Sequence, residues 1–139
     1  MAYWLFKSEP SVWSWQEQVD KGNTGEPWTG VRNHTAKKNM QTMQIGEQGF
    51  FYHSNEGKEI VGIVEVISEY LPDPTDESGK FGMVVVKAVA SLPKRLSLKE
   101  IKQIPELQDM ALVKQSRLSV QPVKGSEWEI ICQLSGLKT

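Results

Sequence analysis

Short apolar runs separated by turn-forming residues recur along the chain, and most have the length of a β-strand. Runs of this kind, rich in β-branched and aromatic residues, are typical of strands. The polar segment SNEGKE separates residues 48–53 from residues 60–67, which predicts a hairpin with a longer loop. Pro122 indicates an edge strand or a strand end, because proline cannot donate to a ladder. The pattern predicts strands over residues 3–6, 48–53, 60–67, 83–90, 118–123 and 127–134.

Capping boxes of the form S-x-x-E mark two helix starts. Ser14 with Glu17 predicts a short helix that extends to about residue 21. Ser97 with Glu100 predicts a second helix over LKEIKQI. Proline is favoured in the first turn of a helix, so Pro105 predicts another short helix over ELQDMAL.

A further helix is predicted after Asn33, a good N-cap residue. Ala36, Met40 and Met43 follow at the spacing of one helix face, and Gly46 is the expected end. With the strands, this gives the order β-α-α-β-β-β-α-α-β-β. Consecutive short strands favour a small curled sheet or barrel with helices packed outside it. The length of 139 residues is that of one domain.

Charge changes this picture slightly. The net charge is −1, divided into +1 on residues 1–46, −6 on residues 47–82 and +4 on residues 83–139. An anionic partner would therefore bind the two positively charged ends of the chain and avoid the acidic middle. The single cysteine, Cys132, lies in an apolar run and is expected to be a buried thiol in a reducing compartment. No signal peptide or membrane span is recognisable, so we expect a cytoplasmic protein, or a nuclear one if the source is a eukaryote.

Motifs for common enzyme chemistry are missing from the sequence. It holds no phosphate-binding glycine motif, no dinucleotide fingerprint and no nucleophile elbow. One cysteine and two distant histidines form no zinc pattern. We therefore predict no catalytic residue, cofactor or metal site. An alternative stays open, in which His53 acts with Glu9 or Ser54 as the acid–base pair of a hydrolase or nuclease.

Polar residues and aromatics are interleaved at the ends of several predicted elements, where rigid scaffolds present binding groups. The segments are KSEP (7–10), WTGVRN (28–33), FYHSN (51–55) and RLS (117–119). If they converge, they form a hollow that suits a nucleobase and its phosphate. Each residue also has a structural interpretation: Trp28 in the core, Arg32 paired with a carboxylate such as Glu9, and Asn33 as a simple cap. The remaining tryptophans are assigned to packing.

Seven short motifs occur in the order found in a known family: YWLFKSEP, W-x-GVRN, FYHSN, IVGIVEVI, YLPDPT, SLKEIK-x-x-PEL and RLSVQPV. By these the chain resembles the EVE domain family of the PUA-like superfamily. The resemblance implies a single α+β domain over residues 1–139, a small mixed β-barrel flanked by short helices and related to the YTH readers of methylated RNA. It also implies recognition of methylated or otherwise modified cytosine in DNA, within an aromatic-lined pocket.

Site residues follow from the same resemblance by position. Trp28 would be a stacking wall, and Arg32 and Arg117 would hold phosphate or brace the loops. Asn33, together with Ser8 and Ser54, would read the edge of the base. His34 stands where the family often has tyrosine, Lys38 stands where asparagine is common, and the segment after YLPDPT is short, which implies a more open pocket. The full implied set is Lys7, Ser8, Glu9, Trp28, Gly30, Arg32, Asn33, Tyr52, His53, Ser54, Asn55, Arg117, Leu118 and Ser119.

We therefore expect a non-enzymatic, monomeric reader whose partner is modified DNA, with RNA as the alternative ligand and an effector protein as a second partner. One methyl group should give about fivefold discrimination. Replacing Trp28 with alanine is expected to abolish binding while leaving the fold intact.

Overall fold

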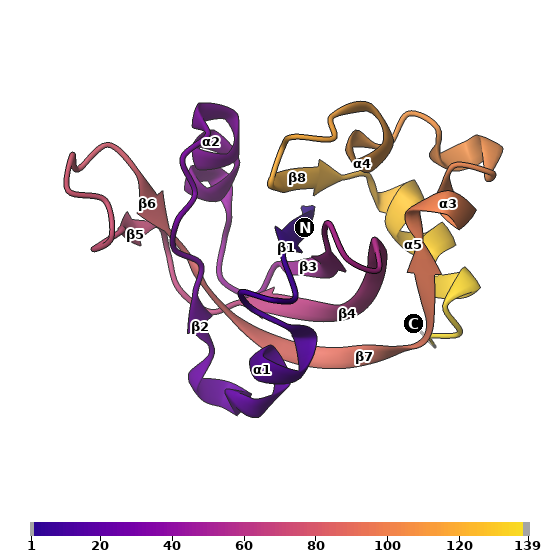
Figure 1. Cartoon of the computed structure of the whole chain (residues 1–139), viewed down its shortest axis with the longest axis horizontal. Coiled ribbons are helices and arrows are strands. Elements are labelled where there is room, and N and C mark those ends of the chain that lie inside the picture. Colours follow the sequence, from indigo (N-terminus) through magenta and orange to yellow (C-terminus); the bar gives the residue numbers. More distant parts are fainter. Residues whose placement is uncertain (1, 138–139) are drawn as a thin grey trace.

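A curled, mixed six-stranded sheet forms the frame of the protein (Figure 1). The computed structural model describes residues 2–137. The strand order is β2-β7-β4-β3-β1-β8, and the long strands β4 and β7 bend to give a half-barrel. A second, two-stranded sheet pairs β5 with β6. The strands are β1 (Tyr3–Ser8), β2 (Glu26–Pro27), β3 (Gln48–His53), β4 (Glu59–Val66), β5 (Leu71–Pro72), β6 (Gly82–Met83), β7 (Val85–Ser97) and β8 (Val120–Val123).

Short helices surround the sheet, as the capping signals predict. Both capping boxes are confirmed: Ser14 precedes α1 (Trp15–Asp20), and Ser97 precedes α3 (Leu98–Ile101). The Asn33 side chain caps α2 (His34–Thr42), which ends four residues before the predicted stop at Gly46. The other helical segments are η1 (Gly22–Thr24), η2 (Pro105–Leu107), α4 (Ala111–Lys114) and α5 (Gly125–Leu134).

The strand predicted over residues 127–134 is wrong, because this segment is helix α5. The Glu127 carboxylate accepts a hydrogen bond of 2.9 Å from the Lys124 backbone N–H and so closes the helix start. Trp128 stacks on Tyr3 and Phe50, with ring centroids 4.3 and 4.1 Å apart. Trp128, Ile131 and Cys132 follow helical spacing and are buried, so an apolar run alone cannot distinguish a buried helix from a strand.

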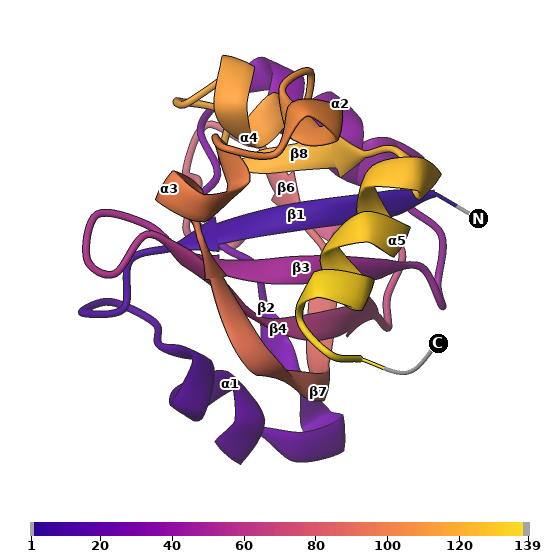
Figure 2. The ribbon, with the colours of Figure 1, turned by 90° about the vertical axis from the view of Figure 1, so that its right-hand side faces the viewer.

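The sheet separates two apolar cores, since successive side chains of a strand point to opposite faces. Phe6 and Phe51 lie in the core covered by α1 and α2. Phe50 and Tyr52 lie in the other core, which α3, α4 and α5 cover. Figure 2 shows α5 lying across one face of the sheet, with α1 at the lower end of the view near β7. Cys132 is buried in the second core, as predicted.

The strand pairing brings the ends of distant segments together. β1 runs parallel to β3, so that Ser8 pairs with His53 and the two strands end at the same edge. The backbone N–H of Ser54 donates to the Ser8 carbonyl oxygen at 2.9 Å. β8 is the last strand of the sheet, which confirms the edge position expected from Pro122. The predicted hairpin of β3 and β4 is also confirmed.

Candidate functional site

A cavity of ≈ 440 Å³ lies between the end of β1 and the segment that begins at β2. Its volume is in the range typical of small-molecule sites. Two of the segments singled out by the sequence, KSEP and WTGVRN, therefore meet as expected. The lining residues are Lys7, Ser8, Glu9, Val12, Trp13, Glu26, Pro27, Trp28, Thr29 and Gly30.

Trp28 belongs both to the core and to the cavity wall. The indole packs edge-on against Phe6 and Phe51, with centroid distances of 5.3 and 5.7 Å. Only 7% of the residue is exposed, and that remainder lines the cavity. The core position that the sequence offered for Trp28 is confirmed, and its role as a stacking wall stays a prediction that the cavity lining allows. It follows that alanine at this position would also remove part of the core, so the expectation of an intact fold needs revision.

Trp13 is a second tryptophan in the cavity wall, although the sequence predicts mainly a packing role for this residue. It is half-buried, and its indole Nε1–H donates to Gln18 Oε1 at 2.9 Å. Its backbone N–H donates to the Glu9 carbonyl oxygen, so the turn after β1 closes over the cavity. Its position in the sequence, three residues after the KSEP segment, could have identified Trp13 as a residue of the cavity.

The polar groups at the end of β1 are partly engaged within the protein. The Ser8 hydroxyl donates to the Trp13 carbonyl oxygen, which leaves only its lone pairs for a ligand. The Lys7 ammonium donates to the Ser116 carbonyl oxygen at 2.7 Å, and burial lowers the pKa of Lys7. Because an ammonium has three donors, two hydrogens of Lys7 remain available. Glu9 is exposed at the rim.

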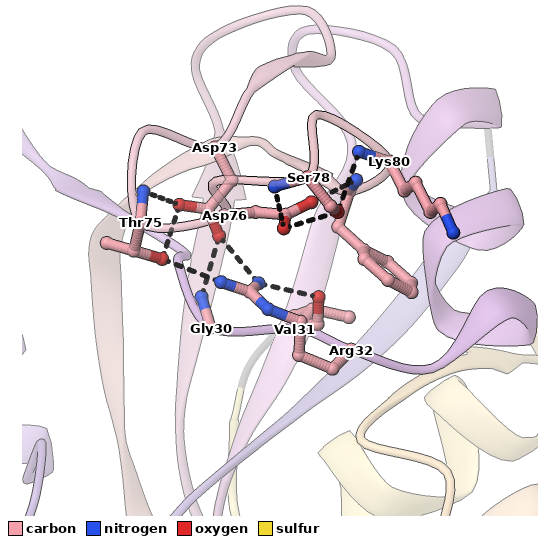
Figure 3. A network of polar contacts seen from close by, with 9 residues as sticks. Gly30, Val31, Arg32, Asp73, Thr75, Asp76, Ser78 and Lys80 are labelled. Atoms are coloured by element: carbon pink, nitrogen blue, oxygen red, sulfur yellow. Dashed lines mark hydrogen bonds and ion pairs between the residues drawn. The ribbon is translucent and has the colours of Figure 1, made fainter.

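A buried carboxylate, Asp73, holds the segment after Trp28 in place (Figure 3). It accepts hydrogen bonds from the Gly30 backbone N–H at 2.8 Å and from Arg32 at 3.1 Å. Thr75 donates to it from both its N–H and its hydroxyl. Burial alone would raise the pKa of Asp73, but the bonds from Thr75, Gly30 and Arg32 outweigh it and lower the pKa to about 2. The predicted surface loop 70–80 is therefore anchored by this residue.

Arg32 braces this loop, one of the two roles that the family resemblance implies for it. Its guanidinium bonds Asp73 and the Thr75 hydroxyl, so the expected partner Glu9 is wrong. Phe81 lies 5.8 Å below the guanidinium and packs against the His34 ring at 5.0 Å. His34 thus occupies the position expected for an aromatic residue and keeps a ring contact there.

The segment after β3 contributes less to the cavity than predicted. Tyr52 faces the opposite core, where burial raises its pKa to about 12. His53 Nε2 accepts a hydrogen bond of 3.1 Å from the Trp15 backbone N–H, which fixes the ring to α1. Ser54 lies beside Ser8 at the start of the loop toward β4, and Asn55 in the same loop adopts a positive φ of 65°. None of these four residues lines the ≈ 440 Å³ cavity in the described chain.

The pKa of His53 tests the hydrogen bond that its Nε2 accepts from the Trp15 N–H. Burial, followed by the neighbouring Arg95 charge, lowers the pKa of His53 from its ordinary 6.5. An NMR titration of the ring protons should therefore give a pKa below 6.5. The unfolded chain then binds more protons, so the stabilising contribution of neutral His53 should decline as pH falls from 6.5 toward the folded pKa. A value at or above 6.5 would contradict the acceptor role assigned to Nε2.

A second hollow of ≈ 330 Å³ is lined by Asn33, Thr35 and residues 114–118, which include Arg117 and Leu118 of the RLS segment but not Ser119. Arg117 is exposed there, whereas Leu118 is buried. The Ser119 carbonyl oxygen accepts a hydrogen bond of 2.9 Å from the backbone N–H of Lys7, a residue of the first cavity. Lys7 connects the two hollows through its bond to Ser116. The Asn33 amide oxygen is engaged by the Ala36 N–H at 2.9 Å, so its amide hydrogens remain for a ligand.

Within residues 2–137, no group of three or more His, Cys, Asp or Glu side chains is placed to hold a metal ion. None of the helices in that range combines the length and apolar character that a membrane crossing requires.

Known proteins resemble the chain over nearly its whole length. The EVE domain model matches residues 2–134. Rpa0253 of Rhodopseudomonas palustris is 60% identical, with a TM-score of 0.93 over 98% of this chain and 94% of that one. Thymocyte nuclear protein 1 of Gallus gallus is 32% identical, covering 95% of this chain and 68% of that protein.

Two further structures extend the comparison. Human THYN1, solved in complex with 5-methylcytosine-containing DNA, is 28% identical, with a TM-score of 0.91 over 100% of both chains. A YTH domain of Zygosaccharomyces rouxii MRB1, in complex with N6-methyladenosine RNA, reaches a TM-score of 0.57 at 20% identity, covering 99% of this chain and 89% of that one. The expected α+β, PUA-like fold is thereby confirmed.

Proposed function

Since the chain belongs to the EVE domain family, we propose that it is a nucleic-acid-binding module that holds a modified cytosine of DNA in the cavity beside Trp28. The observation that carries the proposal is an aromatic wall, Trp28, fixed rigidly by Phe6 and Phe51 against a cavity of ≈ 440 Å³. The human relative solved with 5-methylcytosine DNA supports the choice of ligand.

Two tryptophans give the cavity its affinity for a flat ring. Stacking of a base on an aromatic side chain contributes about 1–3 kcal/mol. Trp28 is held by the core, and Trp13 is held by its bond to Gln18, so both rings are ordered before a ligand enters. Preorganised walls lose little conformational entropy on binding. Stacking on the two ordered rings therefore offsets the few kcal/mol needed to unstack a base from its helix.

The positions of the cations fit the phosphates beside a captured base. Lys7 lies at the junction of the two hollows, and Arg117 is exposed in the second. With a net charge of only −1, the protein has little general attraction for nucleic acid. We therefore expect weak affinity and assistance from an effector protein.

We propose that binding is not coupled to catalysis. His53, the candidate acid–base residue, is engaged through Nε2 with the Trp15 backbone and lies outside the lining of the described cavity. Incubation with modified and unmodified oligonucleotides, with and without divalent metal, should leave both strands intact. Turnover that disappears in His53→Ala would establish the hydrolase or nuclease alternative instead.

The methyl group itself should contribute modestly. Burial of one carbon contributes about 0.8 kcal/mol, so 5-methylcytosine DNA should bind about fivefold more tightly than the same duplex with cytosine. Fluorescence anisotropy with the two duplexes, at one fixed salt concentration, measures this ratio. Equal affinities would remove the methyl group from the recognised features.

RNA is the second candidate ligand, because the YTH domain with the same fold was solved with N6-methyladenosine RNA. Competition between DNA and RNA strands of one sequence separates the two, since only RNA carries the 2′-hydroxyl. We expect the DNA strand to compete more strongly. Stronger competition by RNA would reassign the partner while keeping the cavity as its site.

A further inference from the structure

A cavity for 5-methylcytosine must also reject thymine. The two bases share the pyrimidine ring and the 5-methyl group, so stacking and methyl burial cannot separate them. They differ at position 4, where cytosine has an amino donor and thymine a carbonyl acceptor, and at N3. Selection therefore depends on which hydrogen-bonding groups the cavity wall presents.

The backbone donors along the cavity wall are engaged within the protein. The Trp28 N–H donates to the Val84 carbonyl oxygen at 2.8 Å, and the Thr29 N–H donates to that of Pro27 at 3.0 Å. The Gly30 N–H donates to the Asp73 carboxylate. In the turn after β1, the N–H groups of Val12 and Trp13 both donate to the Glu9 carbonyl oxygen at 2.9 Å. These five backbone N–H groups are therefore unavailable to the O4 carbonyl of thymine.

Acceptors are more abundant on the same wall. Ser8 presents only lone pairs, because its hydroxyl hydrogen points to the Trp13 carbonyl oxygen. Of the two lining carboxylates, Glu26 lies 3.7 Å from the Lys21 ammonium. Glu9 has no hydrogen-bond or ion-pair partner for its carboxylate among residues 2–137. It is therefore the unengaged carboxylate of the cavity.

Building on the proposed function, we infer that Glu9 is the residue that selects 5-methylcytosine over thymine, by accepting a hydrogen bond from the exocyclic 4-amino group. A carboxylate accepting from the cytosine amino group is an established form of base reading. The same carboxylate would face the O4 carbonyl of thymine, where two acceptors repel each other.

The test uses two duplexes that differ in one base, 5-methylcytosine or thymine, each opposite an abasic site so that extrusion breaks no base pair. The wild-type protein should bind the 5-methylcytosine duplex at least about tenfold more tightly. In Glu9→Gln the preference should fall to within about threefold, since the amide can donate to O4 as readily as it accepts from the amino group. Glu69→Gln, an exposed glutamate outside the cavity lining, is the control and should keep the wild-type ratio.

The outcomes separate this inference from the proposed function. A wild-type ratio near one, or an unchanged ratio in Glu9→Gln, overturns the role of Glu9 while the cavity remains the binding site. Undiminished binding of both duplexes by Trp28→Phe overturns the proposed function and this inference with it. Because Glu9 is exposed, its substitution should leave the thermal unfolding midpoint unchanged, so a change in the ratio reports recognition.

Discussion

Trp28→Ala should lower the free energy of unfolding by about 3 kcal/mol and also abolish binding to 5-methylcytosine DNA. The stability loss arises because the indole is 7% exposed and packs against Phe6 and Phe51 on the inner face of the sheet. The binding loss arises because the same ring forms the cavity wall. Urea denaturation measures the first effect, and titration below the unfolding transition measures the second.

Trp28→Phe separates the two effects, because a phenyl ring keeps most of the core contact and reduces the stacking area. We expect it to fold and to bind about tenfold more weakly, within the range of stacking energies. Trp128→Phe is the matched control. Trp128 is equally buried and stacks on Tyr3 and Phe50 in the other core. Loss of affinity in both variants alike would indicate general destabilisation and remove Trp28 from the site.

Asp73→Ala should lower the free energy of unfolding by about 2 kcal/mol, because it removes a buried carboxylate that accepts four hydrogen bonds. The carboxylate side chain is fully buried and accepts from Gly30, Arg32 and Thr75. Its loss frees the segment after Trp28, so affinity for modified DNA should fall as well. Glu77→Gln, an exposed charge in the same loop, should change neither quantity by a measurable amount. Asp73→Ala with unchanged stability and affinity would contradict the bracing role.

The same residue gives the protein a defined acid sensitivity. With a pKa of about 2 in the folded state and 3.8 as its ordinary value, Asp73 contributes about 2 kcal/mol above pH 4. Because the folded pKa is the lower one, this contribution disappears as pH falls from about 4 to about 2. Asp73→Asn should lack that part of the pH dependence, which denaturation midpoints in this range would detect.

Much of the fold could be predicted from the sequence, because its signals are local. The capping hydrogen bonds of Ser14, Asn33 and Ser97 each span three residues, so each helix start is encoded within one turn. The β3–β4 hairpin likewise joins neighbours in the chain. The family motifs further identified the segments that form the cavity, including Trp28 and Lys7.

Tertiary structure decided which of those segments meet and what each side chain does there. Parallel pairing of β1 with β3 joins segments more than forty residues apart, and the bond from Gly30 to Asp73 spans 43 residues. Such contacts depend on the curvature of the whole sheet, which no local pattern encodes. The apolar run at Trp128 is a helix whose buried face stacks on Tyr3 and Phe50, residues far away in the sequence. The sequence by itself thus determined the starts of α1, α2 and α3 and the segments that line the cavity, whereas long-range packing determined their geometry.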